Sequence, residues 1–130
     1  EAVCVLPAGH ALCDKPAIHA QDLRNESFVS LSRGSPFRAK LDEIFAREDI
    51  ARSFAIETRT QHTAYEFVKS GVGVAILDPF IIDSQDIEVV IKPFLPKVTW
   101  GYAVVQSHSA SPSLITQSFI SLLMARYAPD

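Results

Sequence analysis

Arg33 is the side chain in this sequence best suited to bind a negatively charged ligand. It stands in the polar segment Ser32-Arg33-Gly34-Ser35, after an apolar run and before Pro36. A guanidinium in such a turn can hold a carboxylate through two parallel hydrogen bonds, and the free N–H groups of a following helix also favour an anion. We therefore predict an anion-binding turn with Ser32 as a further hydroxyl donor; alternatively, Arg33 is a solvated turn residue. Ser35 is better explained as the N-cap of the helix than as a ligand contact.

A second polar turn, Thr58-Arg59-Thr60-Gln61, follows the next apolar run. Thr60 is expected to cap the helix that begins there, while Thr58 or Gln61 could reach a ligand. Arg59 is equally well explained as an exposed charge. Open α/β sheets bind ligands at the carboxyl ends of their strands, where helices begin, so we expect this turn and Arg33 to line one site.

Apolar runs alternate with amphipathic stretches along the chain, and these elements must position the two turns. The expected strands are 2–6, 27–31, 53–57, 73–77, 87–93 and 99–105, and the expected helices are 20–25, 36–47, 61–70 and 112–127. The alternation predicts an α/β fold with a mostly parallel sheet and helices on both faces. The last two strands lack a helix between them, and Pro93 and Pro96 interrupt that link, so one of these strands is expected to be antiparallel or at an edge.

The helical stretches carry apolar stripes that predict which face each helix buries. In 36–47 the stripe consists of Phe37, Leu41, Ile44 and Phe45, and in 61–70 it consists of Ala64, Phe67 and Val68. Gly71 is placed where a helix needs a left-handed C-terminal residue. Arg38 and Asp42, four residues apart, are predicted to pair on the solvent face of their helix. Phe94, Trp100 and Tyr102 are expected in the core.

The composition excludes several classes of function. The 130 residues carry a formal net charge of −3 without a basic run, so nothing indicates a nucleic-acid surface. No apolar run has membrane-spanning length, and the first residues do not resemble a signal peptide. Cys4 and Cys13 are expected to be reduced and cytosolic, with a disulfide as the alternative. The four histidines have no partner at metal-ligand spacing, so neither a metal nor a cofactor is predicted.

No arrangement of side chains typical of an enzyme is present. There is no nucleophile with a base, no Walker-type phosphate loop and no carboxylate pair placed for acid–base chemistry. Asp78 precedes Pro79 after a strand, which is ordinary turn chemistry. A small α/β enzyme is therefore the least favoured of the functional alternatives.

An ordered set of short motifs resembles the effector-binding domain of LysR-type transcriptional regulators. The motifs are Val5-Leu6-Pro7-Ala8-Gly9-His10-Ala11-Leu12, Asp22-Leu23, Phe28-Val29-Ser30-Leu31, Arg38 with Leu41-Asp42, and Val68-Lys69-Ser70-Gly71-Val72-Gly73-Val74-Ala75-Ile76. Their order and spacing agree with the family over nearly the whole chain. The continuation Leu77-Asp78-Pro79-Phe80 resembles the branch that senses opines and basic amino acids.

The resemblance implies a fold like type II periplasmic binding proteins, with two lobes around a ligand cleft. The two crossings between lobes would fall near 9–14 and 106–109. Residues 13–106 would then form one complete lobe, and residues 1–8 and 110–130 would be remnants of the other. The family's N-terminal winged helix-turn-helix would be absent, so DNA binding is not expected of this chain. Ala8 and Gly9, at the first crossing, and Pro79, after the third strand, would also line the cleft.

The function implied by the resemblance is that of a cytoplasmic ligand-sensing domain without catalytic activity. A small anionic or zwitterionic metabolite would bind between the lobes, and the full protein would be a homo-oligomer that contacts DNA elsewhere. The alternative is a solute-binding protein of a transport system with the same lobe architecture.

Overall fold

The computed structural model describes residues 1–83, 85–107 and 111–127. It divides into two compact units, Glu1–Trp100 and Gly101–Asp130. The expected crossing at 106–109 and the expected remnant 110–130 therefore fall partly outside the described residues.

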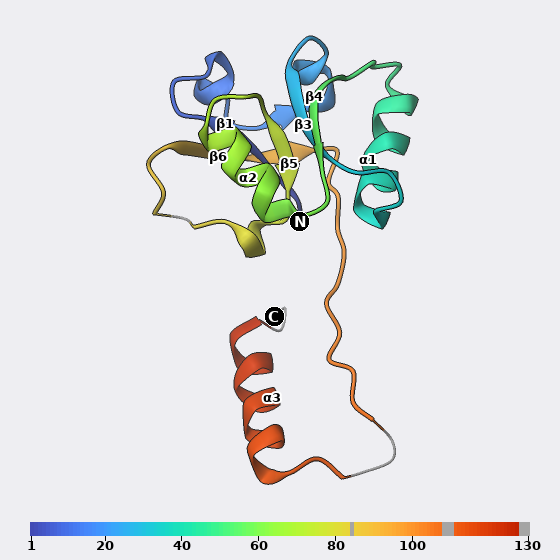
Figure 1. Ribbon diagram of the computed structural model, residues 1–130, viewed down its shortest axis with the longest axis vertical. Coiled ribbons are helices and arrows are strands. Elements are labelled where there is room, and N and C mark those ends of the chain that lie inside the picture. The colour runs from blue at the N-terminus through green and yellow to red at the C-terminus, as the bar shows by residue number, and fades with distance from the viewer. Residues whose placement is uncertain (84, 108–110, 128–130) are drawn as a thin grey trace. The chain divides into compact units, whose positions relative to one another are not determined.

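The first unit is built around a mixed sheet (Figure 1). Its strands are β1 (Val3–Pro7), β2 (Ile18–His19), β3 (Ser27–Leu31), β4 (Ser53–Thr58), β5 (Ala75–Leu77) and β6 (Val89–Leu95). β3 and β4 are parallel, and a parallel bridge from Phe28 to Val74 connects β3 to the start of β5. β1 lies between β5 and β6 and is antiparallel to both, while the short β2 pairs with β6. The four-stranded sheet thus has the order β2-β6-β1-β5, and the bridge places the two-stranded sheet of β3 and β4 beside β5.

Helices α1 (Pro36–Arg47) and α2 (Gln61–Lys69) follow β3 and β4. Both begin as predicted, α1 with Pro36 in its first turn after Ser35, and α2 after Thr60. Gly71 ends α2 with φ of +75°, and its N–H donates to the Val68 carbonyl over 2.9 Å. Three short 3-10 helices complete the unit: η1 (Ala11–Asp14), η2 (Ala20–Leu23) and η3 (Pro79–Ile81).

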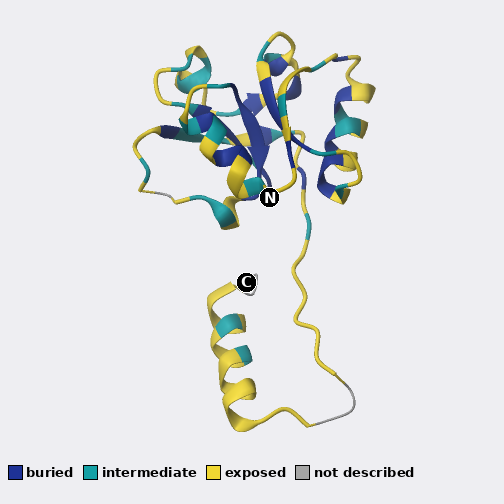
Figure 2. Ribbon diagram, viewed as in Figure 1, coloured by how far each residue is buried: buried dark blue, intermediate teal, exposed yellow. Residues whose placement is uncertain are grey.

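The sheet has an apolar core on each face, because successive strand residues point to opposite sides. Cys4 and Leu6 of β1 join the cluster that contains Phe37, Leu41 and Phe45 of α1. Val5 points the other way, into the cluster that contains Ala64, Tyr65 and Val68 of α2. Figure 2 shows the central strands buried between these layers. The predicted α/β fold with helices on both faces is confirmed.

The α2 stripe differs in part from its prediction. Ala64 and Val68 are fully buried, but Phe67 is only half-buried at the edge of its cluster, and Tyr65 takes the inner position.

The predicted strand at 99–105 is wrong, since the described residues there have no strand conformation. β1 occupies one side of β6 from Val89 to Pro93, and β2 pairs with the other side at Phe94 and Leu95, where the chain leads toward Trp100. Trp100 instead packs against Phe37, with ring centroids 4.1 Å apart and ring planes tilted by 57°. Phe94 is buried as expected, whereas Tyr102 is 69 % exposed and does not belong to the core.

Residues 1–8, which the resemblance assigns to another lobe, complete this sheet. β1 pairs with β5 from Val3 to Val5 and with β6 from Val3 to Pro7. The late strand expected to be antiparallel or at an edge is neither. β6 runs in the same direction as β3, β4 and β5 and lies between β1 and β2, and the strand that runs against the others is β1.

The second unit contains helix α3 (Leu114–Tyr127). It begins two residues later than expected, because the Ser113 hydroxyl accepts the hydrogen bond from the Thr116 N–H. Only Ile120 and Leu123 are half-buried, and the other helix residues are exposed. Within the described residues, no helix combines the length and the apolarity that a membrane span needs.

Candidate functional site

The carboxyl ends of β3, β4 and β5 lie at one edge of the sheet, because these strands run in the same direction. Two hydrogen bonds connect the turns that follow them. The Ser32 N–H donates to the Thr58 carbonyl over 2.6 Å. The Asp78 N–H donates to Gln61 Oε1, also over 2.6 Å. The structure thus brings together the turns at 32–35, 58–61 and 78–80, as the parallel arrangement predicted.

The turn at 32–35 presents its arginine to solvent. Arg33 is exposed, and Gly34 has a φ of +94° that favours glycine. Ser35 occupies the N-cap position of α1, but its side chain makes no capping hydrogen bond. The turn therefore places an exposed cation beside the start of α1, where the Ser35 side chain makes no capping hydrogen bond.

The turn at 58–61 is more tightly held. Thr58 is buried and its hydroxyl donates to the Thr60 carbonyl over 2.9 Å. Thr60 Oγ1 accepts from the Thr63 N–H over 3.1 Å, which confirms the predicted cap of α2. The Thr58 hydroxyl therefore shapes the turn, while Thr60 and the partly exposed Gln61 lie at its surface.

Asp78 makes more polar contacts in the third turn than the turn chemistry predicted from the sequence. Its carboxylate is 4 % exposed and accepts from the Phe80 N–H (2.9 Å) and from the Trp100 indole N–H (2.7 Å). The first contact is the turn chemistry expected of Asp before Pro. The second contact, from Trp100, joins residues far apart in the sequence, so no local motif predicts it. Pro79 lies exposed beside it.

Ala8 and Gly9 lie away from the end of the sheet at which the other predicted site residues lie. Because β1 is antiparallel to β5, Val3 pairs with Leu77 and the later residues of β1 lead away from that end. The Ala8 N–H donates to the Glu88 carbonyl just before β6, over 2.9 Å. Gly9, with φ of +83°, turns the chain at the opposite edge of the sheet.

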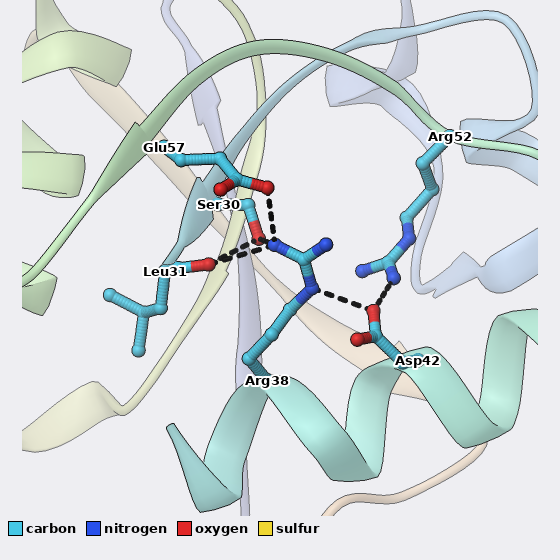
Figure 3. A network of polar contacts seen from close by, with 6 residues as sticks. All are labelled: Ser30, Leu31, Arg38, Asp42, Arg52 and Glu57. Atoms are coloured by element: carbon cyan, nitrogen blue, oxygen red, sulfur yellow. Dashed lines mark hydrogen bonds and ion pairs between the residues drawn. The ribbon is translucent and has the colours of Figure 1, made fainter. Parts of the chain in front are cut away.

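Arg38 lies inside the protein, so its predicted place on the solvent face of α1 is wrong (Figure 3). Its side chain is 4 % exposed. The predicted pair with Asp42 is present, with Arg38 Nε donating to Oδ1 over 2.6 Å. NH1 donates to the Ser30 hydroxyl, the Leu31 carbonyl and Glu57 Oε1 over 2.7, 2.8 and 3.1 Å.

Arg52, the residue before β4, binds the same carboxylate (Figure 3). Its guanidinium lies 4.4 Å from the Phe45 ring centroid and 4.9 Å from that of Phe54. Burial lowers the pKa of Arg52, and the ion pair with Asp42 opposes this shift. Burial alone would raise the pKa of Asp42, but the hydrogen bonds from Arg38 and Arg52 lower it on balance.

Metal and thiol chemistry find no support at the described residues. No three His, Cys, Asp or Glu side chains among them are grouped so that they could hold a metal ion, and His108 lies outside the described part. Cys4 and Cys13 are free thiols, and burial raises the pKa of Cys4. A hollow of about 290 Å³ is lined by other residues: His19, Ala20, Gln21, Asp22, Glu48, Leu95 and Pro96.

Residues 1–128 match the family described as LysR substrate binding domain. The regulatory protein NocR of Agrobacterium tumefaciens is 34 % identical over 124 residues, which are 95 % of this chain and 41 % of that protein. The transcriptional activator protein LysR of Escherichia coli is 29 % identical over 124 residues, 95 % of this chain and 40 % of that protein. The octopine catabolism/uptake operon regulatory protein OccR of Rhizobium meliloti is 26 % identical over 118 residues, 91 % and 39 % of the two chains. The chain thus spans about two fifths of the length of these curated relatives.

Solved structures of regulators share the fold. HinK, a LysR family regulator from Pseudomonas aeruginosa, has a TM-score of 0.75 at 18 % identity, over 97 % of this chain and 44 % of that one. The regulatory domain of Synechocystis CcmR in complex with 2-PG has a TM-score of 0.68 at 18 % identity, covering 98 % and 63 %. The effector binding domain of QuiR in complex with shikimate has a TM-score of 0.65 at 16 % identity, covering 97 % and 60 %. The type II periplasmic-binding-protein architecture expected from the motifs agrees with this set, and with the sequence match it follows that the chain belongs to the LysR substrate-binding domain family, as an effector-binding domain of a LysR-type regulator.

Proposed function

We propose that the carboxyl edge of β3, β4 and β5 is one wall of the effector site, and that its effector is a small anionic or zwitterionic metabolite. The observation that carries the proposal is the joining of three strand-end turns by the Ser32–Thr58 and Gln61–Asp78 hydrogen bonds. These bonds hold an exposed arginine, a helix start and a side-chain amide on one rim.

The roles within this wall follow from the contacts. Arg33 and the first N–H groups of α1 would bind the carboxylate, with Ser32 as a neighbouring hydroxyl. Gln61 accepts from the Asp78 N–H, so it would offer its amide NH₂ to the effector. Thr60 and Pro79 would form the rim, and Thr58 would support it from below. Ala8 and Gly9 have no part in the site because they lie at the other edge.

The rest of the site would come from other parts of the whole protein. We propose that residues 1–100 form one lobe and that α3 belongs to the other, which would cover the apolar side chains α3 exposes. Concentration-dependent association of the 130-residue chain in light scattering is the expected sign of that bare apolar surface. A strictly monomeric chain at all concentrations would argue against it.

The relatives are transcriptional regulators and not enzymes or transport proteins. We propose that this chain likewise does no chemistry and acts in the cytoplasm. Effector binding would bias the arrangement of the two lobes, and the whole protein, as a homo-oligomer, would pass this bias to a separate DNA-binding part. The net charge of −3 without a basic run agrees with DNA contacts elsewhere.

Calorimetry on the whole protein tests the proposal. Octopine, which carries carboxylates and a guanidinium, is the first probe because one relative's name refers to it, and shikimate is the second. Arg33→Ala and Gln61→Ala should each weaken binding of the probe that binds about tenfold or more, since each loses one or two polar contacts. Arg47→Ala, an exposed arginine at the far end of α1, is the matched control. Unchanged affinity in both site variants would place the site elsewhere.

A further inference from the structure

The guanidinium of Arg38 lies where α1 meets the ends of β3 and β4. One of its terminal nitrogens, NH1, contacts three groups: the Ser30 hydroxyl, the Leu31 carbonyl and the Glu57 carboxylate. Nε contacts Asp42 one helical turn further along α1. A single buried side chain therefore ties one helix to two neighbouring strands (Figure 3).

These contacts fall directly beside the proposed effector wall. Leu31 precedes Ser32, and Glu57 precedes Thr58, so Arg38 holds the last residue before each of two turns. The next connection along the strands is the 2.6 Å hydrogen bond from the Ser32 N–H to the Thr58 carbonyl. The spacing of the two turns thus depends on the two strand ends that Arg38 fixes.

We propose that Arg38 is a positioning residue of the effector site, which sets the distance and register between the Ser32 and Thr58 turns without touching the effector. This inference rests on the proposed function of that edge. The planar guanidinium suits the task because its N–H groups diverge in fixed directions, whereas a lysine ammonium is a single point of charge on a flexible chain. Arg52, the residue before β4, supports the arrangement by holding Asp42.

Hydrogen exchange of the 130-residue chain, measured amide by amide by NMR without any ligand, tests the positioning. The reporter is the Ser32 amide, and the reference is the Val29 amide, which donates to the Val74 carbonyl in the same strand. In Arg38→Met the Ser32 amide should exchange about tenfold faster relative to Val29, because the turn opens locally. Arg47→Met, which loses the exposed pair with Glu43, should leave the ratio unchanged.

A purely structural role would accelerate both amides equally, since global unfolding exposes them together. An unchanged Ser32-to-Val29 ratio in Arg38→Met would therefore overturn the proposal. If Arg38→Met does not fold, Arg38→Lys and Glu57→Ala decide the question, because the first keeps the charge and the second removes a single contact. Both should raise the ratio, Arg38→Lys more than Glu57→Ala, and an unchanged ratio in both would count equally against positioning.

Octopine binding by the whole protein adds a second measurement. Arg38→Lys should weaken it about threefold to tenfold while Arg47→Met does not, because a displaced turn misaligns Arg33 and Gln61. Failure of the unmodified protein to bind octopine or shikimate would count against the proposed effector class, and the exchange ratio would still decide the role of Arg38.

Discussion

Helices α1 and α2 occupy equivalent places after two parallel strands, yet they are fastened to the sheet in different ways. α1 begins at Ser35, whose side chain makes no cap, and is held by the buried hydrogen bonds of Arg38. α2 begins at Thr60, whose hydroxyl closes the first turn, and buries only apolar groups and the Tyr65 ring. At α1, buried hydrogen bonds from Arg38 hold the helix to the sheet, while the first N–H groups of the helix have no side-chain cap from Ser35.

The difference suggests how the two turns divide the work of binding. The first N–H groups of a helix attract an anion when no side chain satisfies them. This condition is met better at α1, beside the exposed Arg33, than at α2, where Thr60 accepts from the Thr63 N–H. We therefore expect the carboxylate of an effector at α1, and its neutral polar groups at Gln61.

The largest expected loss of stability comes from truncating the buried apolar side chains by which α1 and α2 pack against the sheet. Phe45 of α1 is 2 % exposed and packs against Phe28 and Phe94, with ring centroids 6.0 and 6.3 Å away. Phe45→Ala should lower the free energy of unfolding by about 3–5 kcal/mol, because it removes a buried aromatic ring and leaves a cavity. Val68→Ala in α2 should cost about 2 kcal/mol, since fewer carbons are lost. Urea unfolding measures both; an equal or reversed order would mean that the aromatic cluster does not dominate the α1 side.

The next largest effect is the difference in stability between replacing Arg38 and replacing Arg52. Arg38→Met should lower the free energy of unfolding by about 1–3 kcal/mol, because the Ser30 hydroxyl and the Leu31 carbonyl lose their shared donor. Arg52→Met should cost about 1 kcal/mol or less. Its side chain lies over aromatic rings that accept a methionine well, and Asp42 keeps its bond to Arg38. Thermal or urea unfolding of both variants checks the order, and a costlier Arg52→Met would contradict this division of roles.

The burial of Arg38 could have been anticipated from its spacing on the helix. It precedes Leu41 by three residues and Phe45 by seven, so it shares their stripe. Its pairing distance to Asp42 fits a surface ion pair equally well, and local sequence does not distinguish the two. The helix starts at Pro36 and after Thr60 were predictable because capping and turn chemistry act within a few residues.

Features that depend on distant partners were not predictable in this way. The apolar run at 3–7 identifies a strand but not its direction, and the antiparallel pairing with β5 is what carries Ala8 and Gly9 to the far edge. The apolar residues of 99–105 likewise suit a strand, but the described residues there have no strand conformation, and Trp100 packs against Phe37 of α1. The contact of Asp78 with Trp100 joins residues 22 positions apart. The turns could be predicted because each follows its own strand. Which residues contact one another at these turns depends on how the strands pair, and the local sequence does not specify that pairing.

A smaller effect distinguishes the two caps. Thr60→Ala should cost about 1 kcal/mol of unfolding free energy, because the Thr63 N–H loses its acceptor. Ser35→Ala should cost a few tenths of a kcal/mol at most, because the Ser35 side chain makes no capping bond. Unfolding curves of the two variants, recorded side by side, give the comparison. A clear loss in Ser35→Ala would show that the start of α1 is closed in solution after all.

The smallest expected effect concerns the polar contacts on the surface of α2. Asp86 accepts from Lys69 and from the Tyr65 hydroxyl, both over 2.8 Å. The hydrogen bond from Lys69, then that from the Glu88 N–H and that from Tyr65, lower the pKa of Asp86 to about 2 from an ordinary value of 3.8. Because the folded state binds this proton less readily than the unfolded state, the stabilisation is complete above about pH 4 and is lost as the pH falls toward about 2.

Asp86→Asn should therefore flatten part of the loss of stability between about pH 4 and 2, because an amide does not titrate there. At neutral pH the variant should be only slightly less stable, since an asparagine oxygen can still accept from Lys69 and Tyr65, and salt screens an ion pair that water partly reaches. Urea midpoints measured in steps across the acid range provide the test, with the exposed Asp14→Asn as the matched control. The same acid slope in Asp86→Asn and in the unmodified chain would show that this contact does not help to hold α2. In that case only the apolar face of α2 and its Thr60 cap would stabilise this helix, whereas α1 is also held by the buried hydrogen bonds of Arg38.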